Sequence, residues 1–422
     1  MNEQFLSYLW KSRQLYPDLK TEAGDTLTIL HPGDQNRDGG PDFFNARLRI
    51  GDTTWAGNVE IHVRASHWFK HGHQFDPAYD NAILHVVYEA DLAVDHPDGG
   101  PMQTLVVKDR FPERILDRYQ QMMINQQWIP CYNQLQGVAE TGFSLWAPGL
   151  AVERLVCKAF NVKQLWGNCK ADWEETFYQH MACSFGFKIN GVPFELLAKS
   201  LPLKIVRKHS EQVLQLEALF FGQSGLLDNS IEGDYPKALL HEYQFMKKKY
   251  NLKSVPAGTW KFLRLRPMNF PTIRISQWVD FLVSTHLKFF ELIEDGSFSE
   301  VLKALNICAS SYWDTHYVFG KETACQRKII GRDSINLLII NGIVPLMFFF
   351  GLEKDQPAMR EKALSFLEQV NGEHNAEISR WTAAGLPIGT ALHTQALLHL
   401  KRYYCEKKRC LDCRIGNALL TH

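Results

Sequence analysis

The hydrophobic pattern changes its period near residue 130, and this change constrains the fold more than any other feature of the 422-residue chain. Before it, apolar residues alternate with polar ones or form short runs, as in β-strands. After it, they recur every three or four residues, as in helices. We therefore expect an α+β protein, with a mixed α/β domain over residues 1–130 and a larger all-α domain over residues 131–422.

The first domain is expected to contain a hairpin and a buried strand. Residues 43–50 alternate and are followed by Gly51 and Asp52, so residues 53–65 form the returning strand of a hairpin. The continuous apolar run at residues 82–91 fits a strand inside a sheet that is covered on both faces. Further elements are predicted at residues 26–30 and 104–109 (strands) and 3–15 (helix).

The second domain is expected to be almost entirely helical. Its longest apolar run, residues 337–351, is shorter than a membrane span and contains Asn341, Gly342 and Pro345, so it predicts a buried helix pair or a bent helix. Helical periodicity is also found in residues 145–160, 173–187, 210–221, 235–249, 275–293, 298–309 and 360–370.

Charge and the first residues limit the expected partners and compartment. With 46 basic and 46 acidic residues, the formal net charge is zero, so the whole chain has no overall attraction to nucleic acid or to an anionic membrane. Local basic patches still allow DNA or RNA as a partner. The start of the chain lacks the pattern of a signal peptide, and we expect a cytoplasmic protein with no membrane partner. In that reducing compartment, the nine cysteines indicate thiols or metal ligands rather than disulfides.

Acidic and histidine residues concentrate between residues 39 and 91. Asp42 opens the first hairpin strand, and the hairpin turn brings it beside Glu60 on the return strand. Glu60 and His62 lie two residues apart and share one face, with Arg64 next in line. Adjacent carboxylates suit a hard divalent cation, and a histidine adds a softer ligand or a base. We predict one polar site here, a candidate metal site, with Asp42, Glu60, His62 and Arg64 as its candidate catalytic residues.

The loop after the hairpin supplies further imidazoles. His71 and His73 are candidate metal ligands together with Asp42 and Glu60, and loop histidines also fit a zinc-dependent hydrolase. The alternative is that these side chains, with His67, are polar loop residues that bind nothing. His85 lies within an apolar strand, where a hydrogen-bonded core histidine is the simpler interpretation.

The segments GGPDFFNARLRI and GNVEIHV resemble the core of the PD-(D/E)XK nucleases, which carry an acid at the start of one hairpin strand and an acid-x-lysine triplet on the next. Asp42 matches the first acid and Glu60 the second, while His62 stands where lysine is usual. The resemblance implies a restriction-endonuclease-like domain in which Asp42 and Glu60 hold Mg²⁺ or Mn²⁺. His62 or Arg64 would then stabilise the charge that develops while the phosphodiester is cleaved, or His62 would orient the metal-bound water. Some members place another acid in the early helix, which here carries Glu3.

The full chain also resembles a bacterial family that is defined only as a domain of unknown function. The shared features are YLW near the start, GPDFFNA, GNVEIH, an HGH loop, ILHVVYE and a terminal cysteine cluster. This resemblance implies no activity.

Three cysteines near the end, Cys405, Cys410 and Cys413, have the spacing C-x4-C-x2-C. Two thiols separated by two residues form a half-site for zinc or for an iron–sulfur cluster, and we predict such a metal here. Some nucleases of the resembled superfamily carry iron–sulfur clusters closed by C-terminal cysteines. Reduced thiols at a helix end are the alternative. The candidates for a fourth ligand are His399, Cys325, Cys131 and His422.

Basic and aromatic residues are interleaved in residues 262–278. Arg264, Arg266 and Arg274 would suit backbone phosphates and stacked bases, and a structural loop whose arginines cap helix ends fits the same residues. The leading hypothesis is a metal-dependent, nuclease-like phosphodiesterase that acts on DNA or RNA. The alternatives are a nucleic-acid-binding or scaffold protein whose nuclease core has decayed, and a zinc-dependent hydrolase that uses the loop histidines.

Overall fold

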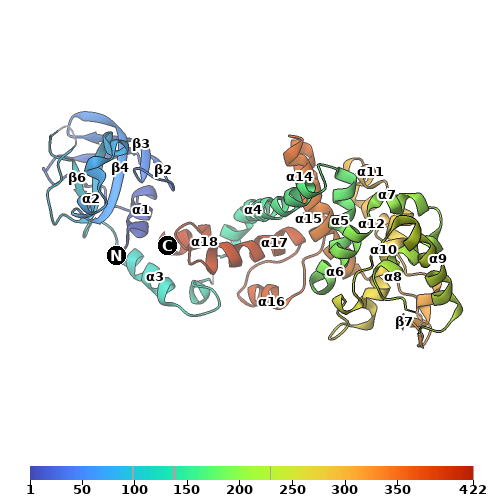
Figure 1. Cartoon of the computed structure of the whole chain (residues 1–422). Helices are drawn as coiled ribbons and strands as arrows, with labels where there is room; N and C mark the ends of the chain where they lie inside the picture. Colours follow the sequence, from blue (N-terminus) through green and yellow to red (C-terminus); the bar gives the residue numbers. More distant parts are fainter. Residues whose placement is uncertain (97–98, 136–138, 229, 422) are drawn as a thin grey trace. The chain divides into compact units, whose positions relative to one another are not determined.

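A mixed sheet forms the N-terminal part of the protein, and helices form most of the rest (Figure 1). The computed structural model describes residues 1–96, 99–135, 139–228 and 230–421. The chain divides into two units. Unit 1 comprises Met1–Phe143 and Lys401–His422, and unit 2 comprises Ser144–Leu400. We expected a single boundary near residue 130. Instead the chain returns to unit 1 at its end, because helix α18 (Arg414–Thr421) packs against α3 (Glu113–Ile124).

The sheet of unit 1 has the strand order β1-β3-β4-β5-β6, and β2 pairs with the edge of β3. β1, β3 and β4 are antiparallel neighbours, whereas β5 runs parallel to both β4 and β6. The parallel pairing places β5 inside the sheet, which explains its continuous apolar sequence. The strand bounds are β1 Leu27–His31, β2 Asp34–Gln35, β3 Phe43–Ile50, β4 Thr53–Arg64, β5 Ala82–Glu89 and β6 Thr104–Val106.

The predicted hairpin is confirmed as β3 and β4. Ile50 pairs with Thr53 next to the turn, where Gly51 adopts a φ of 57° that suits glycine. Burial alternates along the second half of β3, with Ala46, Leu48 and Ile50 turned inward. Nearer its start, the register with β4 shifts between Phe43 and Ala46. This irregularity lies directly beside Asp42, so it bends the strand where the candidate site begins.

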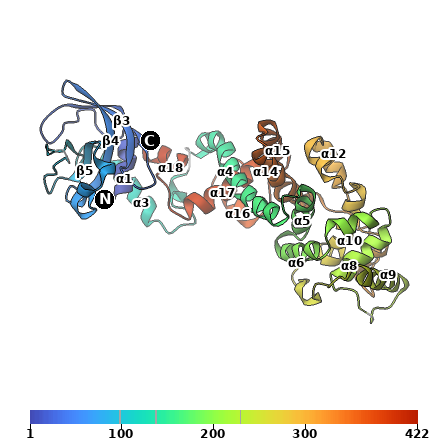
Figure 2. The ribbon, with the colours of Figure 1, turned by 45° about the horizontal axis from the view of Figure 1, so that its top comes forward.

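Helix α1 (Glu3–Lys11) packs against β4 through an apolar side, which includes the fully buried Phe5 and Trp10. The Asn2 side chain accepts a hydrogen bond from the Phe5 N–H and so caps the helix start. The Trp10 indole N–H donates to the Pro32 carbonyl at 2.8 Å. The helix is therefore fixed at both ends beside the sheet (Figure 2), and its first residue, Glu3, is held close to the loop after β4.

Unit 2 is helical apart from the short strands β7 (His316–Val318) and β8 (Lys321–Glu322). Its α-helices are α4 Ala139–Asn168, α5 Trp173–Phe185, α6 Phe187–Ser200, α7 Leu203–Val206, α8 Val213–Gln223, α9 Asp234–Tyr250, α10 Pro271–Ser284, α11 Phe289–Glu294, α12 Phe298–Ala304, α13 Arg332–Leu338, α14 Val344–Glu353, α15 Pro357–Gln369, α16 Ala376–Ala383 and α17 Ala391–Leu400. The helical pattern of residues 275–293 is divided between α10 and α11, because His286 and Leu287 adopt positive φ.

The long apolar run forms a bent helix, as predicted. α13 continues through a π-helical turn, Ile339–Ile343, into α14, and Pro345 occupies the first turn of α14. The stretch Arg332–Glu353 is long and apolar enough to cross a membrane, yet 83% of its most apolar window is buried inside the protein. Burial among the other helices of unit 2 accounts for its composition.

Candidate metal centre

A tight loop before β3 sets the position of Asp42. The side-chain amide of Asn36 donates to the carbonyls of Gly39 and Pro41 at 3.1 and 3.0 Å. The Asn36 N–H donates to the carbonyl of Asp42 at 2.7 Å. Gly40 has a φ of 97°, which lets the chain turn around this amide. The glycine and asparagine residues of the loop therefore deliver Asp42 to the start of β3 in a fixed orientation.

Asp42 and Glu60 hold each other across the hairpin. The Asp42 N–H donates to Glu60 Oε2 at 3.1 Å, and the Ile61 N–H donates to Asp42 Oδ2 at 3.0 Å. Each carboxylate thus accepts a backbone hydrogen bond from the strand that carries the other. The predicted approach of these two acids is confirmed, and the bonds fix their separation.

The connection between β4 and β5 folds its histidines back over the strands. It contains α2 (His67–Lys70) and two 3-10 turns, His73–Phe75 and Pro77–Tyr79. Gly72, with a φ of 78°, reverses the chain between His71 and His73, so both imidazoles face His62. The sequence spacing H-G-H is therefore what allows two loop histidines to reach one point.

Glu60, His62, His71 and His73 converge within short distances. His62 Nε2 lies 3.0 Å from His71 Nδ1 and 3.5 Å from Glu60 Oε1. His73 Nε2 lies 3.3 Å from Glu60 Oε1, although without the geometry of a hydrogen bond. One ligand atom from each of the three histidines falls within 4.8 Å of the others. His62 and His73 are buried and His71 is exposed, so the cluster opens to solvent at His71.

A second layer of rings supports the cluster. His85, on β5, is level with Glu60 in the parallel register, and its Nε2 lies 2.9 Å from His62 Nδ1. Tyr79 stacks on His73 with ring centroids 3.9 Å apart, and Trp68 meets His73 edge-on at 5.4 Å. His85 is thus a buried, hydrogen-bonded histidine, as its position in the strand suggested. It fixes the His62 ring, as the outer partners of metal-binding histidines do.

Burial controls the protonation of the cluster. Burial first, and then the neighbouring imidazoles of His85 and His73, lower the pKa of His62 to about 2. Burial likewise lowers the pKa of His85 to about 3, with His73 as the second cause. Burial, followed by repulsion from Glu60, raises the pKa of Asp42 to about 7. At neutral pH the two imidazoles are therefore neutral, and each keeps the lone pair that a metal ligand needs.

The ligand atoms fit a divalent metal. In a tetrahedral zinc site with imidazole and carboxylate ligands, neighbouring ligand atoms are about 3.3 Å apart. Three pairs come close to this value: His62 and His71 at 3.0 Å, His62 and Glu60 at 3.5 Å, and Glu60 and His73 at 3.3 Å. The atoms that all lie within 4.8 Å of one another are those of the three histidines. Asp42, whose carboxylate accepts from the Ile61 N–H next to Glu60, adds a second carboxylate to the site. Mixed imidazole and carboxylate donors suit Zn²⁺ or Mn²⁺ better than Mg²⁺, which prefers oxygen alone.

The other residues predicted for this site are placed differently. Arg64 lies at the exposed end of β4, where it pairs with Glu89 at 3.6 Å, so it is not part of the Glu60–His62 cluster. Residues that the pattern did not single out come closer. Trp68 and Tyr79 line the cluster, and no spacing signal identified them. Glu3, the acid of the first helix that the nuclease resemblance singled out, also comes close, with its Oε1 3.4 Å from His67 Nδ1.

The predicted cysteines and arginines lie elsewhere. Cys405, Cys410 and Cys413 belong to unit 1, as does Cys131, whereas two other candidate ligands, His399 and Cys325, belong to unit 2. His422 lies outside the described residues. Arg264 and Arg266 are exposed in unit 2.

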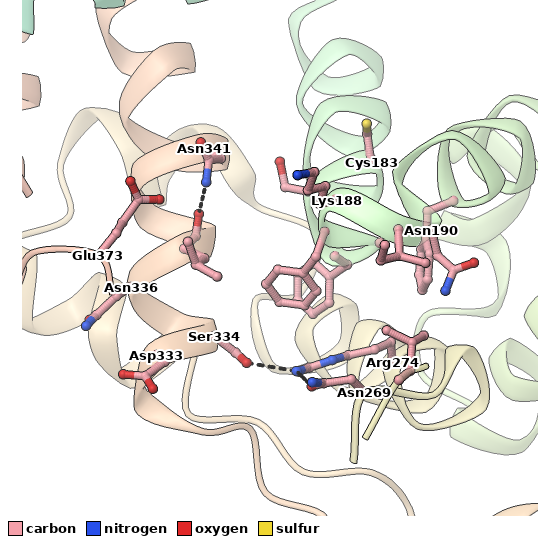
Figure 3. A pocket seen from close by; sticks show the side chains of 18 of the residues that line it. Cys183, Lys188, Asn190, Asn269, Arg274, Asp333, Ser334, Asn336, Asn341 and Glu373 are labelled. Atoms are coloured by element: carbon pink, nitrogen blue, oxygen red, sulfur yellow. Dashed lines mark hydrogen bonds between the residues drawn. The ribbon is translucent and has the colours of Figure 1, made fainter. Parts of the chain in front are cut away.

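Arg274 is only 4% exposed, unlike Arg264 and Arg266. It lines a cavity of about 700 Å³ in unit 2, bounded by α6, α10 and α13 (Figure 3). Its guanidinium donates to Asn269, Gln277 and Ser334, and it lies 4.6 Å from the ring centroid of Phe187. Helix α10 turns this side chain inward, so Arg274 does not lie at the surface, where a residue that binds backbone phosphates would have to be.

A family model described as a protein of unknown function (DUF2851) matches residues 3–376. The match includes all of the Asp42–His85 cluster and ends before the terminal cysteines. No curated protein and no solved structure matches the chain.

Proposed function

Because the chain belongs to the DUF2851 family, whose description assigns no activity, we propose a function from the geometry of unit 1: a metal-dependent, nuclease-like hydrolase of phosphodiester bonds. One observation carries this proposal. His62, His71 and His73 each bring one ligand atom within 4.8 Å of the others, and the Glu60 carboxylate lies 3.3 Å from His73 and 3.5 Å from His62, with Asp42 bound to the same strand. The positions of the two acids, one opening β3 and one within β4, also support the resemblance to the PD-(D/E)XK core.

The neutral state of His62 determines how the site would work. In the resembled nucleases a lysine follows the second acid and supplies a positive charge. A buried imidazole whose pKa is about 2 supplies no such charge at neutral pH. Positive charge at the site would therefore come from the metal, which polarises a phosphodiester and lowers the pKa of a bound water.

The protein side chains would hold and orient the reacting groups. Glu60 lies against both His62 and His73, while His85 fixes the ring of His62 through its other nitrogen. His71 stands at the exposed side, where a substrate phosphate would enter. Asp42, whose pKa is raised to about 7, could exchange a proton with an attacking water near neutral pH. DNA or RNA is the substrate class that the proposal predicts.

A zinc-dependent hydrolase acting on another bond is the second candidate. The specific observation in its favour is that three imidazoles converge and that the Glu60 carboxylate lies 3.3 to 3.5 Å from two of them, since imidazole and carboxylate together are donors typical of zinc enzymes. Both candidates use the same ligands, so they differ in the metal that supports activity and in the bond that is cleaved.

Metal-dependent cleavage by purified protein tests the proposal. The metal-free chain would be reconstituted with Mn²⁺, Zn²⁺ or Mg²⁺ and assayed on single- and double-stranded DNA and RNA. We expect cleavage to fall at least about 100-fold in Glu60→Gln and in His71→Ala, because losing a side chain that binds the metal directly should cost at least as much as losing an outer partner, whose mutation lowers metal affinity or activity about 10- to 100-fold. Asp38→Asn, an exposed acid of the neighbouring loop, is the matched control and should retain activity.

The outcomes separate the candidates. Failure of every metal to support nucleic-acid cleavage, or equal activity of Glu60→Gln and wild type, overturns the nuclease proposal. Metal-dependent hydrolysis of an ester or amide that Glu60→Gln abolishes, with nucleic acids untouched, supports the second candidate instead.

A further inference from the structure

We propose that unit 1 contains a four-thiolate metal centre, formed by Cys131, Cys405, Cys410 and Cys413. It is separate from the cluster of Asp42, Glu60, His62, His71 and His73. The sequence spacing predicted three of the thiolate ligands and left the fourth open. The structure assigns it to Cys131, the one candidate among the described residues that lies in the same unit as the other three.

The four thiols lie close together inside the protein. Cys131, Cys410 and Cys413 are buried and Cys405 is half-buried, and all four are free. Burial raises the pKa of Cys405 well above its usual range, and the other three thiols raise it further. Cys413 and Cys410 add to the effect of burial on the pKa of Cys131, and Cys413 does the same for Cys410. All six pairs among the four thiols therefore lie within electrostatic range of one another.

The turn from Cys410 to Gly416 has a backbone conformation that holds the thiols of Cys410 and Cys413 in place. The Cys413 N–H donates to the carbonyl of Cys410 at 3.3 Å, and the Gly416 N–H donates to Cys413 Sγ at 3.5 Å. A Cβ atom at Gly416 would come within 2.2 Å of the Cys410 carbonyl oxygen, so this close turn requires glycine. Backbone N–H groups that donate to sulfur are typical of metal-bound thiolates, because they stabilise the negative charge.

Three contacts join the C-terminal segment to the residues that precede Cys131. Lys408 Nζ donates to the Met123 carbonyl, and an Arg118 guanidinium nitrogen donates to the Leu419 carbonyl at 3.1 Å. Lys401 Nζ lies 6.0 Å from the centroid of the Trp128 ring. Lys401 and Lys408 also lower the pKa of Cys405 and Cys410, respectively, against the larger effect of burial. Two lysines therefore lie near enough to offset part of the charge that four thiolates would leave around a metal, and Lys401 also pairs with Glu406 at 2.9 Å.

The spread of the sulfurs favours an iron–sulfur cluster. Within the described ranges, the one group of His, Cys, Asp or Glu ligand atoms that all lie within 4.8 Å of one another is the His62–His71–His73 group. The thiols are thus spread more widely than the roughly 3.8 Å edges of a tetrathiolate zinc site. A cluster accommodates a wider spread, since its thiolates bind different irons. Zinc and an iron–sulfur cluster would both be bound by the same four thiolates, and the experiment below distinguishes the two.

The test is metal and sulfide analysis of the full chain purified without oxygen. We expect iron and acid-labile sulfide, with visible absorption, in the wild type. At least a tenfold loss of both is expected in Cys131→Ser and in Cys413→Ser. Cys157→Ser, a half-buried cysteine of unit 2, is the matched control and should retain the full content. Far-ultraviolet circular dichroism shows whether each variant is folded. Glu60→Gln should keep the iron, so failure of this proposal is distinguishable from failure of the proposed hydrolase.

Three results would count against the centre or its occupant. About one zinc per chain without sulfide would retain the four-thiolate site and overturn the cluster. Absence of both metals from the anaerobic wild type overturns the centre. So does a disulfide among the four cysteines in protein alkylated directly on lysis, since a disulfide would consume two ligands.

Discussion

At the scale of single residues, burial decides which ionisable side chains of this protein carry a charge. It lowers the pKa of His62 to about 2 in unit 1 and that of Lys158 to about 7 in unit 2. For His62 the consequence is a lone pair available to a metal. For Lys158 the consequence is a cost to stability, because the folded protein must either bury a charge or release a proton.

Lys158→Met is expected to weaken the pH dependence of stability. Lys158 Nζ donates to the Ile340 carbonyl and to the side chains of Asn341 and Gln395 at 2.8–3.2 Å. Arg154 adds to the lowering of its pKa, and Glu373 opposes it. The folded-state pKa is below the ordinary value of 10.5, so between pH 7 and 10.5 the unfolded chain holds more protons. Stability contributed by this group therefore rises with pH across that window and is lowest below pH 7.

Chemical denaturation at pH 7 and pH 9 measures this effect. One group contributes at most roughly 1.4 kcal/mol per pH unit, and partial solvent access reduces that figure. We expect the wild type to gain up to about 2 kcal/mol that Lys158→Met does not gain. Lys163→Met is the control on the same helix, because its side chain is 62% exposed. Parallel pH profiles for Lys158→Met and wild type would contradict the expectation.

At the scale of elements, the geometry of the candidate metal centre depends on how β4 and β5 pair. The hairpin β3–β4 could be predicted, since alternation and a Gly-Asp turn fix its register locally. The parallel register that sets Glu60 level with His85 could not, because it depends on a connection whose turns pack only in the folded sheet. Cys131 could not be predicted as a ligand for the same reason, because the three cysteines proposed as its partners lie at the other end of the chain. The directions of the His71 and His73 side chains, which depend on the turn at Gly72, could not be predicted from sequence periodicity either.

Gly57→Ala should disturb this register. A Cβ atom at Gly57 would come within 2.4 Å of Ile83 Cγ2 and 2.8 Å of the Asn81 carbonyl oxygen. The substitution would therefore push the start of β5 away from β4, at a cost of about 1–3 kcal/mol, as for other overpacked positions. We expect lower stability of unit 1 and weaker metal binding. Gly39→Ala, which meets nothing within 4 Å, is the control for thermal unfolding and metal titration. Equal behaviour of the two variants would argue against a role of this close approach.

At the scale of the whole molecule, the chain builds one unit from two separated segments. Residues 144–400 form unit 2 without interruption, whereas unit 1 needs both residues 1–143 and the last segment. Helix α18 contributes the buried side chains of Ile415, Leu419 and Leu420 to unit 1. Each such side chain stabilises by about 1.5–3 kcal/mol when buried. The C-terminal segment is therefore a structural part of the sheet-containing unit, although sequence order assigned it to the helical domain.

Truncation after Leu400 should consequently destabilise unit 1 and leave unit 2 unchanged. Hydrogen exchange measured by mass spectrometry assigns the effect, with faster exchange expected in α3 and the sheet and unaltered exchange in α5 and α10. Replacing Cys405, Cys410 and Cys413 by serine in the full chain separates two causes, because α18 then remains while the thiols are lost. If the metal centre contributes to folding, this triple variant falls between wild type and truncation. Equal protection of unit 1 in all three proteins would show that the returning segment adds nothing to its stability.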